Sequence, residues 1–158
     1  MKKIIYFIIF LFLFSGCLER PTSRVVGYPN ISLSKNKIIK IARKHLGKPY
    51  RYGATGPNSF DCSGFVYAVY KTVGVNLPRT SLAQSKIEGR KLSRNQLREG
   101  DIVFFDTSLK GHVNHTGIYL GGGKFIHASS GRAYSVTISD INGWYKNKFR
   151  WGKHINYR

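Results

Sequence analysis

Two kinds of hydrophobic periodicity follow one another along this chain, and their order constrains the fold more than any other feature. Apolar residues recur with helical spacing over residues 35–46 and again from Cys62 to Gly74, and a short helical turn is predicted at residues 81–85. After residue 100 the pattern changes to short runs rich in β-branched and aromatic residues. The predicted strands are residues 101–105, 115–120, 124–128, 134–138 and 149–155. Helices followed by strands indicate an α+β domain.

Composition limits the possible partners. The 158 residues suffice for one domain with a substantial core, and an aromatic content of 14% with only 5 prolines excludes a disordered chain. Two cysteines are too few for a disulfide scaffold. The 26 Lys and Arg against 7 Asp and Glu give a net charge of +19, which favours an anionic partner: nucleic acid, a membrane surface or an acidic cell-wall polymer. Charge alone does not distinguish these three.

The N-terminus has the pattern of an export signal. Lys2 and Lys3 precede an unbroken apolar run over residues 4–14, and Ser15 and Gly16 supply the small residues of a cleavage site. This run is shorter than the roughly 20 residues that a transmembrane helix needs, so we predict a cleaved signal peptide rather than a permanent anchor.

Cys17 follows directly, and residues 14–17 (FSGC) resemble the lipobox of bacterial lipoproteins, whose cysteine is lipidated and becomes the new N-terminus. The alternative is a plain secretory signal followed by an incidental cysteine. The lipobox interpretation divides the chain into a signal peptide (residues 1–16), a lipidated N-terminus and tether (residues 17–33) and a folded domain (residues 34–158).

Cys62 is a candidate nucleophile because it opens a predicted helix. A thiol in the first helical turn lies at the positive end of the helix dipole, which favours thiolate. The neighbouring Asp61 opposes a second negative charge, so activation would need a nearby imidazolium. The alternative is a buried core cysteine, and position alone does not decide between the two.

Two histidines favour the catalytic interpretation. His115 and His127 lie on consecutive predicted strands joined by three glycines at residues 121–123. If the loop has an odd number of residues, Gly117 faces His127 and His115 lies two residues along on the same face, whereas an even loop puts the rings on opposite faces. One imidazole can then take the proton of Cys62 while the other orients the first. The pattern predicts a site for acyl transfer.

Five segments in order resemble the signature blocks of the NlpC/P60 family of bacterial cell-wall cysteine peptidases. They are residues 47–53 (GKPYRYG), 60–66 (FDCSGFV), 100–105 (GDIVFF), 115–121 (HTGIYLG) and 125–128 (FIHA). The resemblance covers nearly all of the mature domain. It implies a papain-like fold in which N-terminal helices pack on an antiparallel β-sheet.

The resemblance also implies the roles of individual residues. Cys62 would be the nucleophile, His115 the general base and later acid, and His127 the orienting third member of a Cys-His-His triad. The Tyr50 hydroxyl, together with the backbone N–H of the nucleophile, would stabilise the oxyanion.

Asp61 and Ser63 flank the nucleophile and have two interpretations. They can contact substrate, or Asp61 can cap the helix by accepting a hydrogen bond from the N–H of Ser63 or Gly64. The sequence does not decide between these two interpretations.

Metal and nucleic-acid partners are not expected. His112 and His115 have a ligand-like spacing, but no second ligand cluster accompanies them, so we predict no metal and no cofactor. The basic, aromatic run over residues 144–158 resembles a nucleic-acid surface, but it is also the pattern of a last strand with a basic face. Because we predict export, we expect no nucleic-acid partner.

The sequence therefore predicts a monomeric, lipid-anchored cysteine endopeptidase that hydrolyses peptide bonds in peptidoglycan through a thioester. The lipid on Cys17 would hold it in the bacterial envelope, at the outer membrane facing the periplasm. The alternatives are an amidase or acyltransferase with the same triad, and a non-catalytic wall-binding lipoprotein. The bond from D-Ala to the diamino acid and the bond from γ-D-Glu to the diamino acid need the same catalytic groups, so the sequence does not choose between them.

Overall fold

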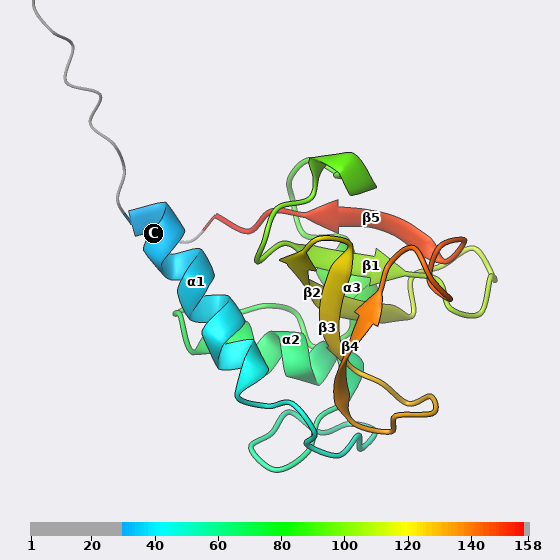
Figure 1. Ribbon diagram of the computed structural model, residues 1–158, viewed down its shortest axis with the longest axis horizontal. Helices are drawn as coiled ribbons and strands as arrows, with labels where there is room; N and C mark the ends of the chain where they lie inside the picture. The colour runs from blue at the N-terminus through cyan, green and yellow to red at the C-terminus, as the bar shows by residue number, and fades with distance from the viewer. Residues whose placement is uncertain (1–29, 157–158) are drawn as a thin grey trace, which may run out of the picture.

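The computed structural model describes residues 30–156, so the predicted signal peptide, Cys17 and residues 17–29 of the predicted tether lie outside the described residues. Within this range the helices come first and the strands follow, which confirms the predicted α+β class (Figure 1). The helical elements are α1 (Asn30–Arg43), α2 (Cys62–Lys71), α3 (Ser81–Ser85) and the 3-10 helix η1 (Arg94–Gln96). The strands are β1 (Ile102–Phe105), β2 (His115–Gly121), β3 (Lys124–Ala128), β4 (Val136–Asp140) and β5 (Phe149–Lys153). All strand pairs are antiparallel, and the order in the sheet is β4-β3-β2-β1-β5.

Helix α1 begins and ends earlier than its periodicity predicts. It starts at Asn30, so residues 30–33, which we assigned to the tether, are helical. It ends at Arg43 because the next residues form tighter turns, in which the N–H of His45 bonds the carbonyl of Ala42 and the N–H of Leu46 that of Arg43. In the described part of the chain, no helix is both long enough and apolar enough to cross a membrane.

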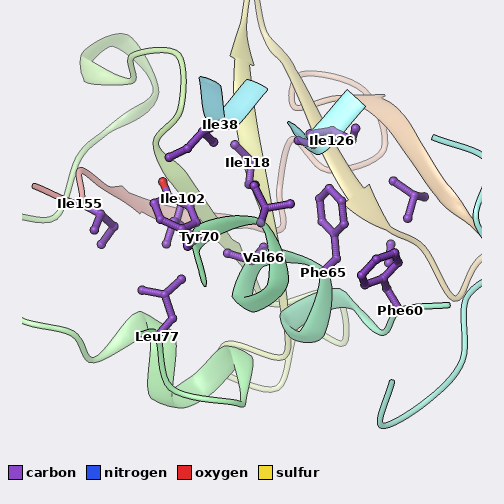
Figure 2. Packing of buried hydrophobic residues seen from close by; sticks show 14 of the residues in the cluster. Ile38, Phe60, Phe65, Val66, Tyr70, Leu77, Ile102, Ile118, Ile126 and Ile155 are labelled. Atoms are coloured by element: carbon purple, nitrogen blue, oxygen red, sulfur yellow. The ribbon is translucent and has the colours of Figure 1, made fainter. Parts of the chain in front are cut away.

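The main core lies between the helices and one face of the sheet. Figure 2 shows Phe65, Val66 and Tyr70 of α2 lying against Ile118 of β2 and Ile126 of β3, all of them completely buried. Burial of large apolar side chains is the main stabilising contribution to such a fold, at about 1.5 to 3 kcal/mol for each. The apolar stripe of α2 therefore holds the start of this helix against the centre of the sheet.

The opposite face of the sheet carries a second, aromatic cluster. Its buried members are Val103, Phe105, Phe125, Ile141 and Tyr145, and the last two come from the β4–β5 connection. Each central strand is therefore buried on both faces, and alternate side chains along it enter different cores.

The β2–β3 hairpin has the predicted register, but its loop differs in length from the predicted loop. The loop contains two residues rather than three, because Gly121 still pairs with Lys124. An irregularity between Tyr119 and Gly121 restores the odd register, so that Tyr119 faces Phe125. The body of the hairpin therefore has the predicted pairing, although the three-residue loop is wrong. The extra residue is accommodated by Gly121, whose φ of +87° is in the left-handed region.

Candidate active site

Cys62 lies at the first residue of α2 with its thiol against the start of β2. The Sγ atom lies 3.4 Å from the hydroxyl oxygen of Ser81 and 4.0 Å from the carbonyl oxygen of Asn114. The backbone N–H of Thr116 lowers the pKa of this thiol. Asn114 and Thr116 flank His115, so the packing of α2 on the sheet brings the candidate nucleophile to the strand position of the candidate base.

The two predicted histidines form a hydrogen-bonded pair on one face of the sheet. The Nε2 atom of His115 lies 2.8 Å from Nδ1 of His127, and Nε2 of His127 lies 2.9 Å from the hydroxyl of Ser139 on β4. Phe125 stacks on His127, and the ring of Tyr145 contacts both imidazoles. The prediction that both histidines share a face is confirmed. Because Nε2 of His115 is occupied, its Nδ1 is the ring nitrogen left for a reaction partner.

Burial keeps the thiol and both imidazoles uncharged at neutral pH. It raises the pKa of Cys62, an effect that the hydrogen bond with Ser81 opposes and the negative charge of Asp61 reinforces. It also lowers the pKa of His115 to about 4. The pKa of His127 is well below its ordinary value because of burial and the proximity of His115. The helix start does favour thiolate, since the backbone N–H of Ser63 lowers the pKa of Cys62, but desolvation is the larger effect and the pKa is raised.

Tyr50 lies in the same cleft as the thiol and remains protonated. Burial raises its pKa, and the charges of Cys62 and Asp61 raise it further. Its hydroxyl is therefore a hydrogen-bond donor at neutral pH, as an oxyanion-stabilising group must be.

Asp61 caps helix α2, which is one of its two predicted roles. Its Oδ1 accepts a 2.6 Å hydrogen bond from the N–H of Gly64, and its Oδ2 accepts one of 2.9 Å from the N–H of Gly53. Arg79 donates to both carboxylate oxygens, and the hydroxyl of Ser63 donates to Oδ1. The carboxylate is thus engaged by four partners, and Arg79 offsets its charge beside the thiol.

The candidate nucleophile and base line two different clefts. One, of about 510 Å³, is lined by Cys62, Tyr50 and Arg79 among others, and it does not include His115. The other, of about 810 Å³, is lined by His115, with Ser139 and Tyr145. Asn114 lines the first cleft and the next residue, His115, lines the second, so the two clefts are related through the start of β2.

The sequence did not reveal three of the residues around the reacting groups: Arg79, Ser81 and Ser139. Arg79 and Ser81 come from the segment around α3, and Ser139 from β4, and no spacing rule relates them to the Cys and His blocks. Residues 78–81 (PRTS) lie before a short helix, but that pattern alone signals only a turn and an N-cap. In residues 30–156, no group of three or more His, Cys, Asp or Glu side chains could hold a metal ion, and His112 does not join such a group.

A helix-borne thiol against the start of a strand that carries one of two paired imidazoles is consistent with a cysteine-dependent acyl-transfer enzyme. The chain belongs to the NlpC/P60 family, whose family model matches residues 47–154.

Relatives of known name are similar over most of the described domain. The probable endopeptidase p60 of Listeria monocytogenes is 42% identical over 118 residues, which are 75% of this chain and 22% of that protein. The murein DD-endopeptidase MepH of Escherichia coli is 35% identical over 119 residues, 73% of this chain and 42% of MepH. The crystal structure of the NlpC/p60 domain of the peptidoglycan hydrolase SagA has a TM-score of 0.67 and 32% identity, over 77% of this chain and 98% of that domain. The chain spans only 20 to 23% of the length of the Listeria p60 relatives that it matches.

Stability should fall in mild acid because of His115. The unfolded chain takes up a proton near pH 6.5, whereas the folded chain does so only near pH 4, so the free energy of unfolding declines as the pH falls through this window. The shift corresponds to about 3 kcal/mol for His115. Urea unfolding at several pH values would measure it, with His115→Gln as the matched variant. A wild-type slope between pH 6.5 and 4 equal to that of the variant would contradict the prediction.

Ser139 should act as a positioning residue for His127. Ser139→Ala removes the hydroxyl that holds Nε2 of His127, and we expect about a fivefold loss in kcat with little change in KM, as for one hydrogen bond of about 1 kcal/mol. Ser139→Thr keeps a hydroxyl and should restore most of the rate. Equal losses in both variants would indicate a packing effect instead.

Proposed function

We propose that this chain is a cysteine endopeptidase that hydrolyses peptide bonds in the stem peptides or cross-links of peptidoglycan. The observation that carries the proposal is the thiol of Cys62 held against the strand that bears His115, whose imidazole is hydrogen-bonded to His127. Membership of the NlpC/P60 family supports it, as do the names of the relatives, which include endopeptidases and a peptidoglycan hydrolase.

The reaction begins from a neutral thiol and a neutral imidazole. As Sγ of Cys62 attacks the scissile carbonyl, Nδ1 of His115 accepts the thiol proton, and His127 holds the resulting imidazolium in place. The Tyr50 hydroxyl and the N–H of Cys62 stabilise the oxyanion; an N–H in the first turn of a helix has no partner within that helix. His115 then protonates the leaving amine, which leaves a thioester on Cys62. Water activated by His115 hydrolyses this thioester and regenerates the thiol.

The two clefts separate the two halves of the substrate. The acyl half becomes bonded to Cys62, so it lies in the cleft that Cys62 lines. The leaving amine takes its proton from His115, so the leaving half lies in the cleft that His115 lines. The substrate therefore runs from one cleft to the other past the start of β2, where Asn114 and His115 lie.

Digestion of purified sacculi tests the proposed function. We expect the wild-type protein to release muropeptides with a newly freed amine on the diamino acid, and the Cys62→Ala protein to release none. Mass spectrometry of the products would also show which of the two candidate bonds is cut. Release of saccharide fragments with intact peptides, release of products by Cys62→Ala, or no release at all would each contradict the proposal for this substrate.

We also propose that a lipid on Cys17 anchors the protein in the bacterial envelope. The support is the FSGC segment after an apolar signal-like run. Such an anchor would hold a basic domain close to the wall, whose peptides carry carboxylates. A Cys17→Ser protein should lose its association with membranes, and one that fractionates with membranes as well as the parent would contradict the anchor.

A further inference from the structure

A pocket of about 420 Å³ adjoins the cleft of Cys62, because Leu82 and Val113 line both. Its other lining side chains include Lys86, Lys91 and Lys153, and none of its lining residues is acidic. We call it the lysine pocket. Three ammonium groups around one small volume create a local positive potential that attracts an anion.

Lys153, on β5, is the innermost of the three lysines. The residue is only 4% exposed, and in the part of the chain that the structure describes its ammonium has no hydrogen bond or ion pair. An ammonium that lines a pocket without an ion pair can take an anion in that pocket as its partner. Burial lowers the pKa of Lys153, and the charge of Lys91 lowers it further. Glu88 acts in the opposite direction but more weakly, and it is itself exposed.

Trp151 supplies an aromatic wall of the lysine pocket. Its indole lines the pocket, and its buried Nε1–H has no hydrogen-bond partner within residues 30–156. The ammonium of Lys91 lies 4.0 Å from the centre of this ring, which holds that lysine at the edge of the pocket. Because the Nε1–H of Trp151 is buried, the lysines are the donors that a ligand in the pocket can reach. The group that would satisfy them is an anionic acceptor.

We propose that the lysine pocket is a substrate subsite that binds a carboxylate on the acyl half of the peptide. This inference rests on the proposed function, which places the acyl half in the adjoining cleft. Peptidoglycan stems supply such a group, because a γ-linked D-glutamate keeps its α-carboxylate free, and the diamino acid carries another. An ionised carboxylate accepts several hydrogen bonds at once, and each is strengthened by charge when the donor is an ammonium.

Equilibrium binding tests the subsite without turnover. The full chain with Cys62→Ala is titrated by calorimetry with stem peptides that are identical except that one carboxylate at a time is replaced by a carboxamide. We expect one of these replacements to weaken binding about tenfold, the effect of losing one charge-assisted contact. Adding Lys153→Met should abolish that difference, because methionine keeps the length of the side chain without its charge. Lys40→Met, a change on α1 outside the pocket, should preserve it.

The results of this binding experiment can be distinguished from those of the sacculus digestion. Binding of all peptides with equal affinity, or of none, overturns the subsite even if the wild-type protein cleaves sacculi. A preference for the carboxylate peptides that survives Lys153→Met also overturns the proposed subsite. If Lys153→Met does not fold, Lys86→Met, at an exposed position of the pocket lining, serves as a second variant. Inorganic phosphate is titrated in parallel: saturation by phosphate that depends on Lys153, with no preference among the peptides, would assign the pocket to a phosphate group instead.

Discussion

Replacing Cys62 with serine should lower kcat/KM by about 10³-fold or more while leaving the fold intact. The hydroxyl of serine is a much weaker acid than a thiol, and an imidazole with a pKa of about 4 is a weak base for deprotonating it. The substitution conserves shape, and the contact with Ser81 can be kept by a hydroxyl. Single-turnover cleavage of a defined stem peptide would measure the loss, and circular dichroism would check the fold.

The pH dependence of thiol alkylation tests the neutral resting state of Cys62 and His115 more directly. Because burial raises the pKa of Cys62, alkylation by iodoacetamide in the absence of substrate should be slow at pH 6 to 7 and should accelerate only above about pH 9. Since His115 must be neutral to accept the thiol proton, kcat/KM should fall as the pH decreases through about 4. Rapid alkylation with a plateau near pH 6 would show a preformed thiolate–imidazolium pair and contradict the neutral resting state.

Replacing Gly64 with alanine should destabilise the protein by about 3 kcal/mol or more and abolish activity at elevated temperature. A Cβ atom at this position would lie 2.1 Å from the carbonyl oxygen of Ala54 and 2.9 Å from Oδ1 of Asp61. Both are fixed: the same carbonyl accepts a hydrogen bond from the N–H of Asp61, and Asp61 caps α2 through the N–H of Gly64. Relief of the clash must therefore displace the loop or the cap that positions Cys62.

Gly143→Ala is the matched control for this prediction. A Cβ there would meet its nearest atom at 3.5 Å, which is ordinary contact, and the backbone is not in the left-handed region. We expect a change of less than about 0.5 kcal/mol, typical of a surface substitution. Denaturant unfolding of the two variants beside the wild type would measure the difference. Equal stability of Gly64→Ala and Gly143→Ala would contradict the close approach of Ala54 to α2.

Local sequence patterns predicted a helix or strand well where one property, such as apolar periodicity, decided it. The apolar stripe that begins at Cys62 marks α2. Asp61 caps this helix, which is one of the two roles predicted for that residue. The strand segments were also found, although β4 begins at Val136, two residues later than predicted, because Tyr134 has a left-handed φ of +45°. The hairpin loop was predicted less well, since a bulge can change loop length without changing register.

The electrostatics of the site could not be predicted in the same way. Position at a helix start favours thiolate and the charge of Asp61 opposes it, and these two local effects were visible in the residues around Cys62. Burial against β2 depends on the packing of α2 on the sheet, and it raises the pKa of the thiol and lowers that of His115. Arg79 and Ser139 also escaped prediction, because they approach the reacting groups only after segments distant in sequence have packed.

The sequence by itself determined the succession of helices and strands and the blocks that resemble the family, and it predicted the shared face of His115 and His127 only on the condition of an odd hairpin register. These depend on periodicity and on residues close together in the chain, where covalent geometry sets which side chains share a face. Only the tertiary structure decided the partners of Asp61 beyond its cap, the neutral state of the thiol and imidazoles, and the pocket around Lys153. Desolvation and long-range contacts produce these features, and both arise only when elements far apart in sequence exclude water between them.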